Sequence, residues 1–584
     1  MSILPHCPFR EDDKDPNRVP VCKGTTQSAY MKTIGIIPPL KSPGLRRTLD
    51  CMGEVLGVRF EERTSRDDWG IDAWLLAEAS PQTLLAMDHC RLPFYLVLPD
   101  DQTVSCGESP RVSFSRHDVL PTVISGRHIE IDKANGLKGL PQWLQNTTAL
   151  ASNGGTPFWA VQKAGVHHNH FVALPIPEMN DGEALFQYFY GKQFLSLLPL
   201  LVFLRVLTDE QRWEPPPLQA CFMFDDPNLH WRTYGYIDFA EMMRHARLHN
   251  YHASFATIPL DAWYVHSQTA HFFKENREHL SLLIHGNDHV AQEMGQDYSE
   301  EERFGILQQA LIRIGKLERR SGVEVSRVMV PPHGACREEF LGTMSLFGLE
   351  AACVSKWSLR NYNSRSTWLR TFGMRPSDVV AGLTVIPRLR MSSNCHNNIL
   401  VAALLHQPII PMGHHDSLSE GFDLLGNLSA FVNSLGSVKW TDMKRISRSN
   451  YARRHDGNIL RLRMFTKRIE ILVPEGIRQL LVERAWLKGT EYEPLAWRVP
   501  GGKMEWIFVR PEESFSVLPG QLIEILSGPS NPPCMNAESI RKLHLWPVIR
   551  RVLTEARDRI IPAPRRFSGK AIPSGMMARR NILS

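Results

Sequence analysis

The segment Cys221-Phe-Met-Phe-Asp-Asp-Pro-Asn-Leu-His230 is an apolar run that stops at two adjacent carboxylates. Residues 218–224 form a short apolar stretch with aromatic enrichment, which is typical of a buried strand in a parallel sheet. Two carboxylates at the end of such a strand repel one another, and one must take up a proton unless a cation lies between them. We therefore predict that Asp225 and Asp226 belong to a metal site.

A second apolar run, Leu282-Leu-Ile-His-Gly-Asn-Asp-His289, leads straight into a histidine that is followed by another four residues later. If a helical turn starts at His285, its imidazole and that of His289 lie on one face and can share one cation. One carboxylate and two imidazoles form a catalytic metal set that leaves a position open for water. The alternatives are two hydrogen-bonded core histidines and, for the aspartates, a helix N-cap followed by a first-turn acid.

These segments resemble the motifs of the polysaccharide deacetylase family, metal-dependent esterases that remove acetyl groups from sugar polymers. The resemblance covers roughly residues 216 to 453. Its motifs follow the family's order: Phe-Asp-Asp at 224–226, His-x-x-x-His at 285–289, Pro-Pro-His-Gly at 331–334 in place of Pro-Pro-Tyr-Gly, and a late strand ending in histidine at 409–415.

The resemblance implies a role for each matching residue. Asp226, His285 and His289 would hold a divalent metal, and the nitrogen-rich set favours zinc. Asp225 would be the general base that takes a proton from the metal-bound water. Backbone N–H groups near Pro332-His333-Gly334 would bind the substrate and stabilise the oxyanion.

The late strand ends in two adjacent histidines, either of which could protonate the leaving group. His415, followed by Asp416, fits the family pattern better, and His414 is the alternative. The chain also departs from the family, because Val330 stands where the third motif usually has an arginine that orients the base. Arg388, which we also place among the substrate-binding residues, or Arg390 could supply that cation.

The composition of the 584 residues, with 43% hydrophobic and 22% charged side chains, is that of a globular protein of about three domains. A formal charge of +6 does not indicate a nucleic-acid binder. The ten cysteines include no Cys-x-x-Cys pair, which favours reduced thiols. The N-terminus lacks a signal-peptide core, and the longest apolar run, 194–204, is shorter than the ~20 residues of a membrane span, so we expect a cytoplasmic protein.

Strands and helices alternate through most of the chain, which predicts an α/β fold in several domains. The chemistry at strand C-termini predicts a (β/α) barrel, complete or distorted to seven strands. The predicted order is a disordered N-terminus at 1–30, an α/β layer domain at 31–215, the deacetylase-like barrel at 216–453, a small β-rich domain at 454–540, a C-terminal helix at 541–563 and a basic disordered tail at 564–584.

Local patterns outside the motifs predict further features. The capping-box spacing of Ser299 and Glu302 and the stop at Gly322 predict a helix over 299–320. A helix over 545–560 is expected to dock through its apolar side, which carries Leu545, Ile549, Val552, Ala556 and Ile560.

Two groups of side chains invite a functional reading that we do not favour. Of His167, His168 and His170, only the last two share a strand face, and no carboxylate flanks them closely, so we interpret them as surface residues. The tryptophans at 486, 497 and 506 could stack on sugars, but in small sheets such side chains are more often core.

The sequence as a whole predicts a metal-dependent hydrolase that removes an acetyl group from an acetylated sugar or glycan. One alternative keeps the metal site but cleaves another non-peptide C–N bond, such as a formamide or a cyclic amide. Another is a glycan-binding or scaffold protein with a degenerate site, which the lost motif arginine and the flanking domains favour. No nucleic-acid partner is expected.

Overall fold

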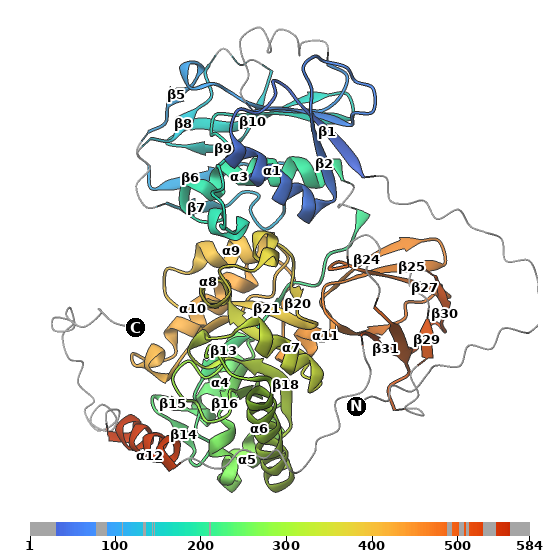
Figure 1. The fold of residues 1–584 in the computed structure, drawn as a ribbon. Helices are drawn as coiled ribbons and strands as arrows, with labels where there is room; N and C mark the ends of the chain where they lie inside the picture. Colours follow the sequence, from blue (N-terminus) through green and yellow to red (C-terminus); the bar gives the residue numbers. More distant parts are fainter. Residues whose placement is uncertain are drawn as a thin grey trace, which may run out of the picture.

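The computed structural model describes residues 31–77, 90–107, 109–131, 136–142, 144, 146–208, 212–487, 493–501, 507–509, 513–528 and 545–560. Figure 1 shows an N-terminal α/β part, a central barrel and a β-rich part beside the barrel. The segments 1–30 and 564–584, predicted to be disordered, lie outside the described residues. In the described part of the chain, no helix is long and apolar enough to cross a membrane.

The N-terminal part is built on a mixed sheet with the strand order β2-β1-β3-β4-β11-β10-β9-β6-β7. Its strands from β2 to β11 pair in parallel, and those from β11 to β7 pair antiparallel. The bounds are β1 Lys32–Ile36, β2 Val58–Glu62, β3 Ala73–Leu76, β4 Phe94–Val97, β6 Arg111–Phe114, β7 His128–Glu130, β9 Thr148–Asn153, β10 Thr156–Ala164 and β11 His167–Val172.

Two helices pack together against this sheet, α1 (Pro43–Leu56) and α3 (Gly191–Leu207). Helix α1 has Ser42 as N-cap and Gly57 in the left-handed conformation after its end. A short 3₁₀ turn at Leu185–Tyr188 precedes α3.

The central part is a closed barrel of seven parallel strands, which confirms the predicted distorted (β/α) barrel. Strand β13 pairs with β16 on one side and with β22 on the other, and this second pairing closes the ring. The strands are β13 Phe222–Asp225, β16 Ala253–Thr257, β17 Leu280–His285, β18 Val325–Val330, β19 Ala351–Ser355, β21 Leu383–Arg390 and β22 Pro411–Gly413, with β20 Asp378–Val380 added antiparallel to β21. A buried apolar cluster that includes Met223, Leu283, Val328 and Ile386 packs together within this ring of strands.

Helices follow the strands around the outside of the barrel (Figure 1). They are α4 Phe239–His249, α5 Ser267–Glu275, α6 Glu300–Ser321, α7 Glu338–Leu346, α8 Lys356–Tyr362, α9 His396–Leu404, α10 Asp423–Asn433 and α11 Met443–Arg448. The capping box predicted for α6 is confirmed: Ser299 Oγ accepts the N–H of Glu302 at 3.2 Å, and Glu302 Oε2 accepts the N–H of Ser299 at 2.9 Å.

The β-rich part consists of two four-stranded sheets that share one apolar core. Strands β25 and β27 pair in parallel, and the other described pairings of these two sheets are antiparallel. Trp497 stacks on Phe515 with ring centroids 5.5 Å apart, and it packs with Trp486 on the core, in line with the core interpretation. Trp506 lies outside the described residues. The strands are β24 Tyr451–Asp456, β25 Ile459–Met464, β27 Gln479–Arg484 and β30 Phe515–Ser516 in one sheet, and β26 Arg468–Leu472, β31 Leu522–Ser527, β28 Leu495–Arg498 and β29 Ile507–Val509 in the other.

Helix α12 (Leu545–Ile560) docks the opposite way round from its prediction. The apolar side chains Leu545, Ile549 and Val552 are 73%, 50% and 62% exposed. The basic side docks instead, because the Arg551 guanidinium is buried against the buried Asp261 carboxylate, with Nε 3.0 Å from Oδ2. An ion pair with a buried carboxylate therefore sets the orientation of this helix.

Candidate metal centre

The two aspartates and two histidines of the motifs meet at the C-terminal ends of the barrel strands. Asp225 is the last residue of β13, and His285 is the last residue of β17. Asp226 and His289 follow these strands in the left-handed conformation, with φ of 65° and 55°. The described backbone thus turns sharply beyond both strands and aims four polar side chains at one place.

The predicted helical turn from His285 to His289 is wrong. The segment after β17 is instead a loop held by the buried carboxylate of Glu293, which accepts the N–H groups of Asn287 and Asp288 at 2.9 and 2.8 Å. Gly286 has a φ of 59°, and a Cβ there would lie 2.4 Å from Glu293 Oε2. Glycine lets the loop pass this close to the carboxylate.

Three electron-pair donors converge at the centre of this cluster. Asp226 Oδ1 lies 3.0 Å from His285 Nε2 and 2.8 Å from His289 Nε2. His285 Nδ1 lies 2.8 Å from the carbonyl oxygen of Val330, so Nδ1 carries the proton and Nε2 directs a lone pair at Asp226. Asp226 Oδ1 is buried and makes no hydrogen bond of good geometry to the described residues.

Without a metal, an imidazole N–H can donate to Asp226 at these distances, and once both Nε2 atoms are deprotonated the same three atoms form a donor set that fits a divalent metal. The contact between His285 and Val330 is of the kind that fixes the tautomer of a metal-ligating imidazole. His414 lies further out, with its Nε2 3.8 Å from Asp226 Oδ2, the other oxygen of the same carboxylate.

Charges around the cluster keep the acids ionised. Burial would raise the pKa of Asp226, but the imidazoles of His289 and His285 hold it well below its usual range. For His285 the balance is reversed: burial would lower its pKa, and the carboxylates of Asp225 and Asp226 raise it. The two carboxylates thus favour positive charge at this point, whether as a proton on an imidazole or as a metal ion.

Asp225 has a separate partner, the buried guanidinium of Arg388 on β21. Arg388 Nη1 donates to Asp225 Oδ1 at 2.8 Å and to Oδ2 at 2.9 Å, and both side chains are almost fully buried. Burial would raise the pKa of Asp225, but the charges of Arg388 and His285 lower it. The structure therefore places Arg388 behind the carboxylate, not on a surface that a substrate reaches, while Arg390 is exposed.

The two histidines after β22 point to different places. His414 is half-exposed and faces Asp226. His415 packs edge-on against Tyr234, with ring centroids 4.9 Å apart, and lies beside Tyr236 in the hairpin of β14 (Thr233–Tyr234) and β15 (Ile237–Asp238). Of the two residues, it is His414, the alternative of the sequence interpretation, that lies at the cluster.

The segment Pro332-His333-Gly334 forms a 3₁₀ turn next to His289. The ring of His333 lies 5.0 Å from that of His289, and its Nδ1 accepts the N–H of Gln292 at 3.3 Å. The N–H groups of Gly334 and Ala335 donate to carbonyl oxygens within the turn. These two N–H groups are therefore already used, whereas the His333 side chain is at hand beside the metal ligands.

Sequence reasoning did not find Arg550 of α12 as a neighbour of this cluster. Its Nη2 lies 3.0 Å from His289 Nδ1, although 261 residues separate the two in the chain. Arg313 of α6 is also close, donating to Asp288 Oδ1 at 2.6 Å and to Asn287 Oδ1 at 2.7 Å. No motif marks either arginine, and only the docking of the helices brings them here.

A cavity of about 760 Å³ opens beside the cluster, between α12 and the 3₁₀ turn at Pro259–Trp263. Aromatic side chains dominate its rim: Trp231, Trp263 and Tyr264 are 50%, 66% and 45% exposed. Asn228, two residues beyond Asp226, also lines it. The side chains of the cluster do not line this cavity themselves, and Asn228 and Arg313 are the links between the two.

Comparison with known proteins finds remote structural similarity. In part the chain is similar to a protein described as a polysaccharide deacetylase from Mycobacterium smegmatis, with 14% identity and a TM-score of 0.30 over 41% of this chain and 91% of that one. It is likewise similar to the Xyl-CE4 domain of a multidomain xylanase from the hindgut metagenome of Trinervitermes trinervoides, with 10% identity and a TM-score of 0.23 over 38% of this chain and 86% of that one. No family model and no curated protein matches the sequence. The assignment of function therefore depends on the side chains themselves.

Proposed function

We propose that the protein is a metal-dependent hydrolase that removes an acetyl group from an acetylated sugar or glycan. The observation that carries this proposal is that two adjacent carboxylates, Asp225 and Asp226, have different partners. Asp226 faces two imidazole nitrogens within 3.0 Å, and Asp225 is bound to Arg388 at 2.8 Å. One acid is thus arranged as a ligand and the other as a base.

A divalent metal held by Asp226, His285 and His289 would polarise an acyl carbonyl and lower the pKa of a bound water. Asp225 would take the proton of that water, since Arg388 keeps its carboxylate ionised and fixes its orientation. His414, half-exposed and on the open side of the cluster, would protonate the departing amine or alcohol. His415 is committed to its tyrosine neighbours, so we assign this role to His414.

The carbohydrate part of the proposal depends on the neighbouring cavity. Exposed Trp231, Trp263 and Tyr264 offer flat apolar faces in this cavity, and such faces suit the C–H surfaces of sugar rings. A formamide or a cyclic amide would not need so extended an aromatic rim.

The missing motif arginine no longer favours the alternative of a degenerate site. Val330 replaces the arginine that the motif usually supplies, but Arg388 from β21 reaches the base with two contacts. The cation is therefore supplied from a different strand.

The proposal is tested by metal content and hydrolysis together. The wild type is expected to carry a metal in the barrel, and the double variant His285→Ala/His289→Ala is expected to lose it. The wild type should also release acetate from acetylated oligosaccharides, and the double variant should not. The variant His271→Ala, which changes an exposed histidine on α5, serves as control. A double variant that keeps full metal content and activity would overturn the proposal. If the protein released only formate or a ring-opened product, the proposed substrate would change to a formamide or a cyclic amide.

A further inference from the structure

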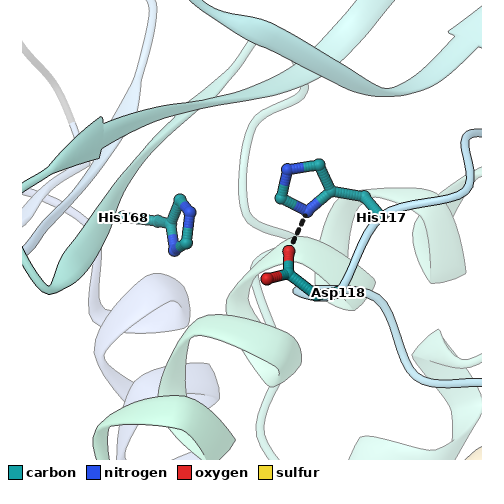
Figure 2. A group of neighbouring side chains, drawn as sticks. All are labelled: His117, Asp118 and His168. Carbon is teal, nitrogen blue, oxygen red and sulfur yellow. Dashed lines mark ion pairs between the residues drawn. The ribbon is translucent and has the colours of Figure 1, made fainter.

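A second cluster of histidine and carboxylate side chains lies in the N-terminal part, far along the chain from the barrel motifs. His168 is on β11, and His117 and Asp118 follow β6. The sequence offered no carboxylate next to the histidines at 167–170, but the sheet brings one there from about 50 residues earlier. Figure 2 shows the His117 ring and the Asp118 carboxylate on one side and the His168 ring facing them.

The donor atoms of this cluster are close enough to share one ion. One donor atom from each of the three side chains lies within 4.8 Å of the others. His117 Nδ1 is 2.8 Å from Asp118 Oδ1, and the two imidazole rings are 5.7 Å apart and nearly perpendicular, at 81°. Two nitrogens and one carboxylate oxygen are the donor types that Zn²⁺ and its neighbours in the transition series accept.

The surroundings suit a weakly to moderately bound ion. His117 is 20% exposed, so its ring is largely held in place, whereas Asp118 is 85% exposed and leaves room for water ligands. His168 is likewise only partly exposed, so its ring is also held close to the pair. Lys163, directly opposite His168 in the strand register, adds positive charge that limits the affinity.

Without a metal, the same geometry is a close contact between His117 and Asp118, with His117 Nδ1 also accepting the N–H of Val119 at 3.2 Å and the His168 ring packed edge-on against His117. His168 comes from a different strand and still faces the pair, whereas its neighbour His167 lies on the opposite face of β11. The arrangement of donors is thus richer than one ion pair requires.

We propose that His117, Asp118 and His168 bind a divalent transition-metal ion at a site separate from the barrel. The ion would join β11 to the segment after β6, which β9 and β10 separate in the sheet. Asp118 also lines a cavity of about 580 Å³ whose wall includes His406 of the barrel region and Arg463 of the β-rich part. The site would therefore strengthen the N-terminal part close to its junction with the others.

The test uses the full chain with His285→Ala/His289→Ala, which removes the imidazoles of the barrel cluster. After treatment with a chelator, this protein is titrated with Zn²⁺ and, for its absorption spectrum, with Co²⁺. We expect one ion per chain, a rise in Tm on binding, and at least a ten-fold loss of affinity when His117→Ala/His168→Ala is added. His128→Ala, an exposed histidine on β7, is the matched control and should bind as the background does.

The outcomes separate this inference from the proposed function. The second site would be overturned if the His285→Ala/His289→Ala protein bound no ion. It would also be overturned if adding His117→Ala/His168→Ala to that protein left its affinity for the ion unchanged. In the wild type the two sites together should give two ions per chain, and His117→Ala/His168→Ala alone should leave one ion and unchanged hydrolysis. If the wild type bound one ion and only the barrel substitutions removed it, the inference would be wrong and the proposed hydrolase would be unaffected.

Discussion

The barrel and the N-terminal part each bring two histidines and a carboxylate together, but the two clusters differ in what surrounds them. In the barrel, His285 is hydrogen-bonded to a backbone carbonyl. The neighbouring carboxylate, Asp225, accepts hydrogen bonds from a buried arginine. In the N-terminal cluster the carboxylate is 85% exposed and its histidine is its own chain neighbour. Burial and second partners, not the donor types, make the first cluster suitable for catalysis, because electrostatic interactions are stronger away from water.

The largest effect is expected from Asp225→Asn, which removes the base but leaves the ligands. An amide cannot accept the proton of the attacking water, so kcat/KM should fall by about 10²–10⁴-fold while metal content stays unchanged. The measurement is deacetylation kinetics beside elemental analysis. Asp297→Asn, which changes an exposed aspartate, is the control, and a variant with near-normal turnover would exclude Asp225 as the base.

Arg388→Met tests how the buried partner supports the barrel cluster. The substitution leaves Asp225 buried without its cation, which should cost about 3–5 kcal/mol in the free energy of unfolding. Denaturant titration measures this cost, and Arg390→Met, the exposed neighbour on the same strand, should change little.

The same variant should change the dependence on pH. In the wild type the pKa of Asp225 is lowered, so the pair stabilises the fold above the unfolded-state pKa of about 3.9, and this contribution is lost as pH falls through the lower folded value. Without Arg388, burial acts with less opposition, and the acid limb of the kcat/KM profile should move to higher pH. An unmoved limb would mean that another group titrates.

Arg550→Ala should increase the affinity of the barrel cluster for a metal, and so widen its difference from the N-terminal cluster. A guanidinium only donates hydrogen bonds, so its contact with His289 Nδ1 favours the tautomer whose Nε2 carries the proton. Removing it should raise the affinity for Zn²⁺ a few-fold. Competition with a chromophoric chelator measures the change, with Arg557→Ala on the same helix as control, and weaker binding in the variant would contradict the expectation.

The smallest effect is expected from Asp118→Asn in metal-free protein. An exposed pair such as His117–Asp118 contributes less than about 1 kcal/mol, so the Tm should hardly move. With Zn²⁺ present, the same substitution should reduce the rise in Tm seen with the wild type. Thermal unfolding with and without the ion measures both, and a large loss in metal-free protein would show that the pair matters for folding itself.

The sequence predicted the barrel and the neighbourhood of its site because both depend on local signals. Short apolar runs that end in Asp or His mark strand ends, and the ends of parallel strands meet at one rim. The path to His289 was wrong, because it depends on Glu293, whose carboxylate returns to the loop from outside the motif.

Contacts between distant segments were beyond the same reasoning. The sequence offered Arg388 and Arg390 as equal candidates, and residues two apart lie on the same face of a strand. They differ because Arg388 lies inside the packed barrel against Asp225, whereas Arg390 is the exposed last residue of β21. Likewise, a pattern of apolar residues could not reveal that α12 docks through Arg551, because the buried Asp261 that attracts it belongs to another part of the chain.

The double pairing of β13, with β16 on one side and β22 on the other, also has a consequence for a nascent chain on the ribosome. Asp225 is synthesised 163 residues before Arg388, and β22 comes later still. Until then the first strand has an open edge and its buried acid has no cation, so the ring cannot close and Asp225 cannot take up its ion-paired position. The cluster can be completed only after translation has passed Gly413, so a metal held there would be captured late in the assembly of the barrel.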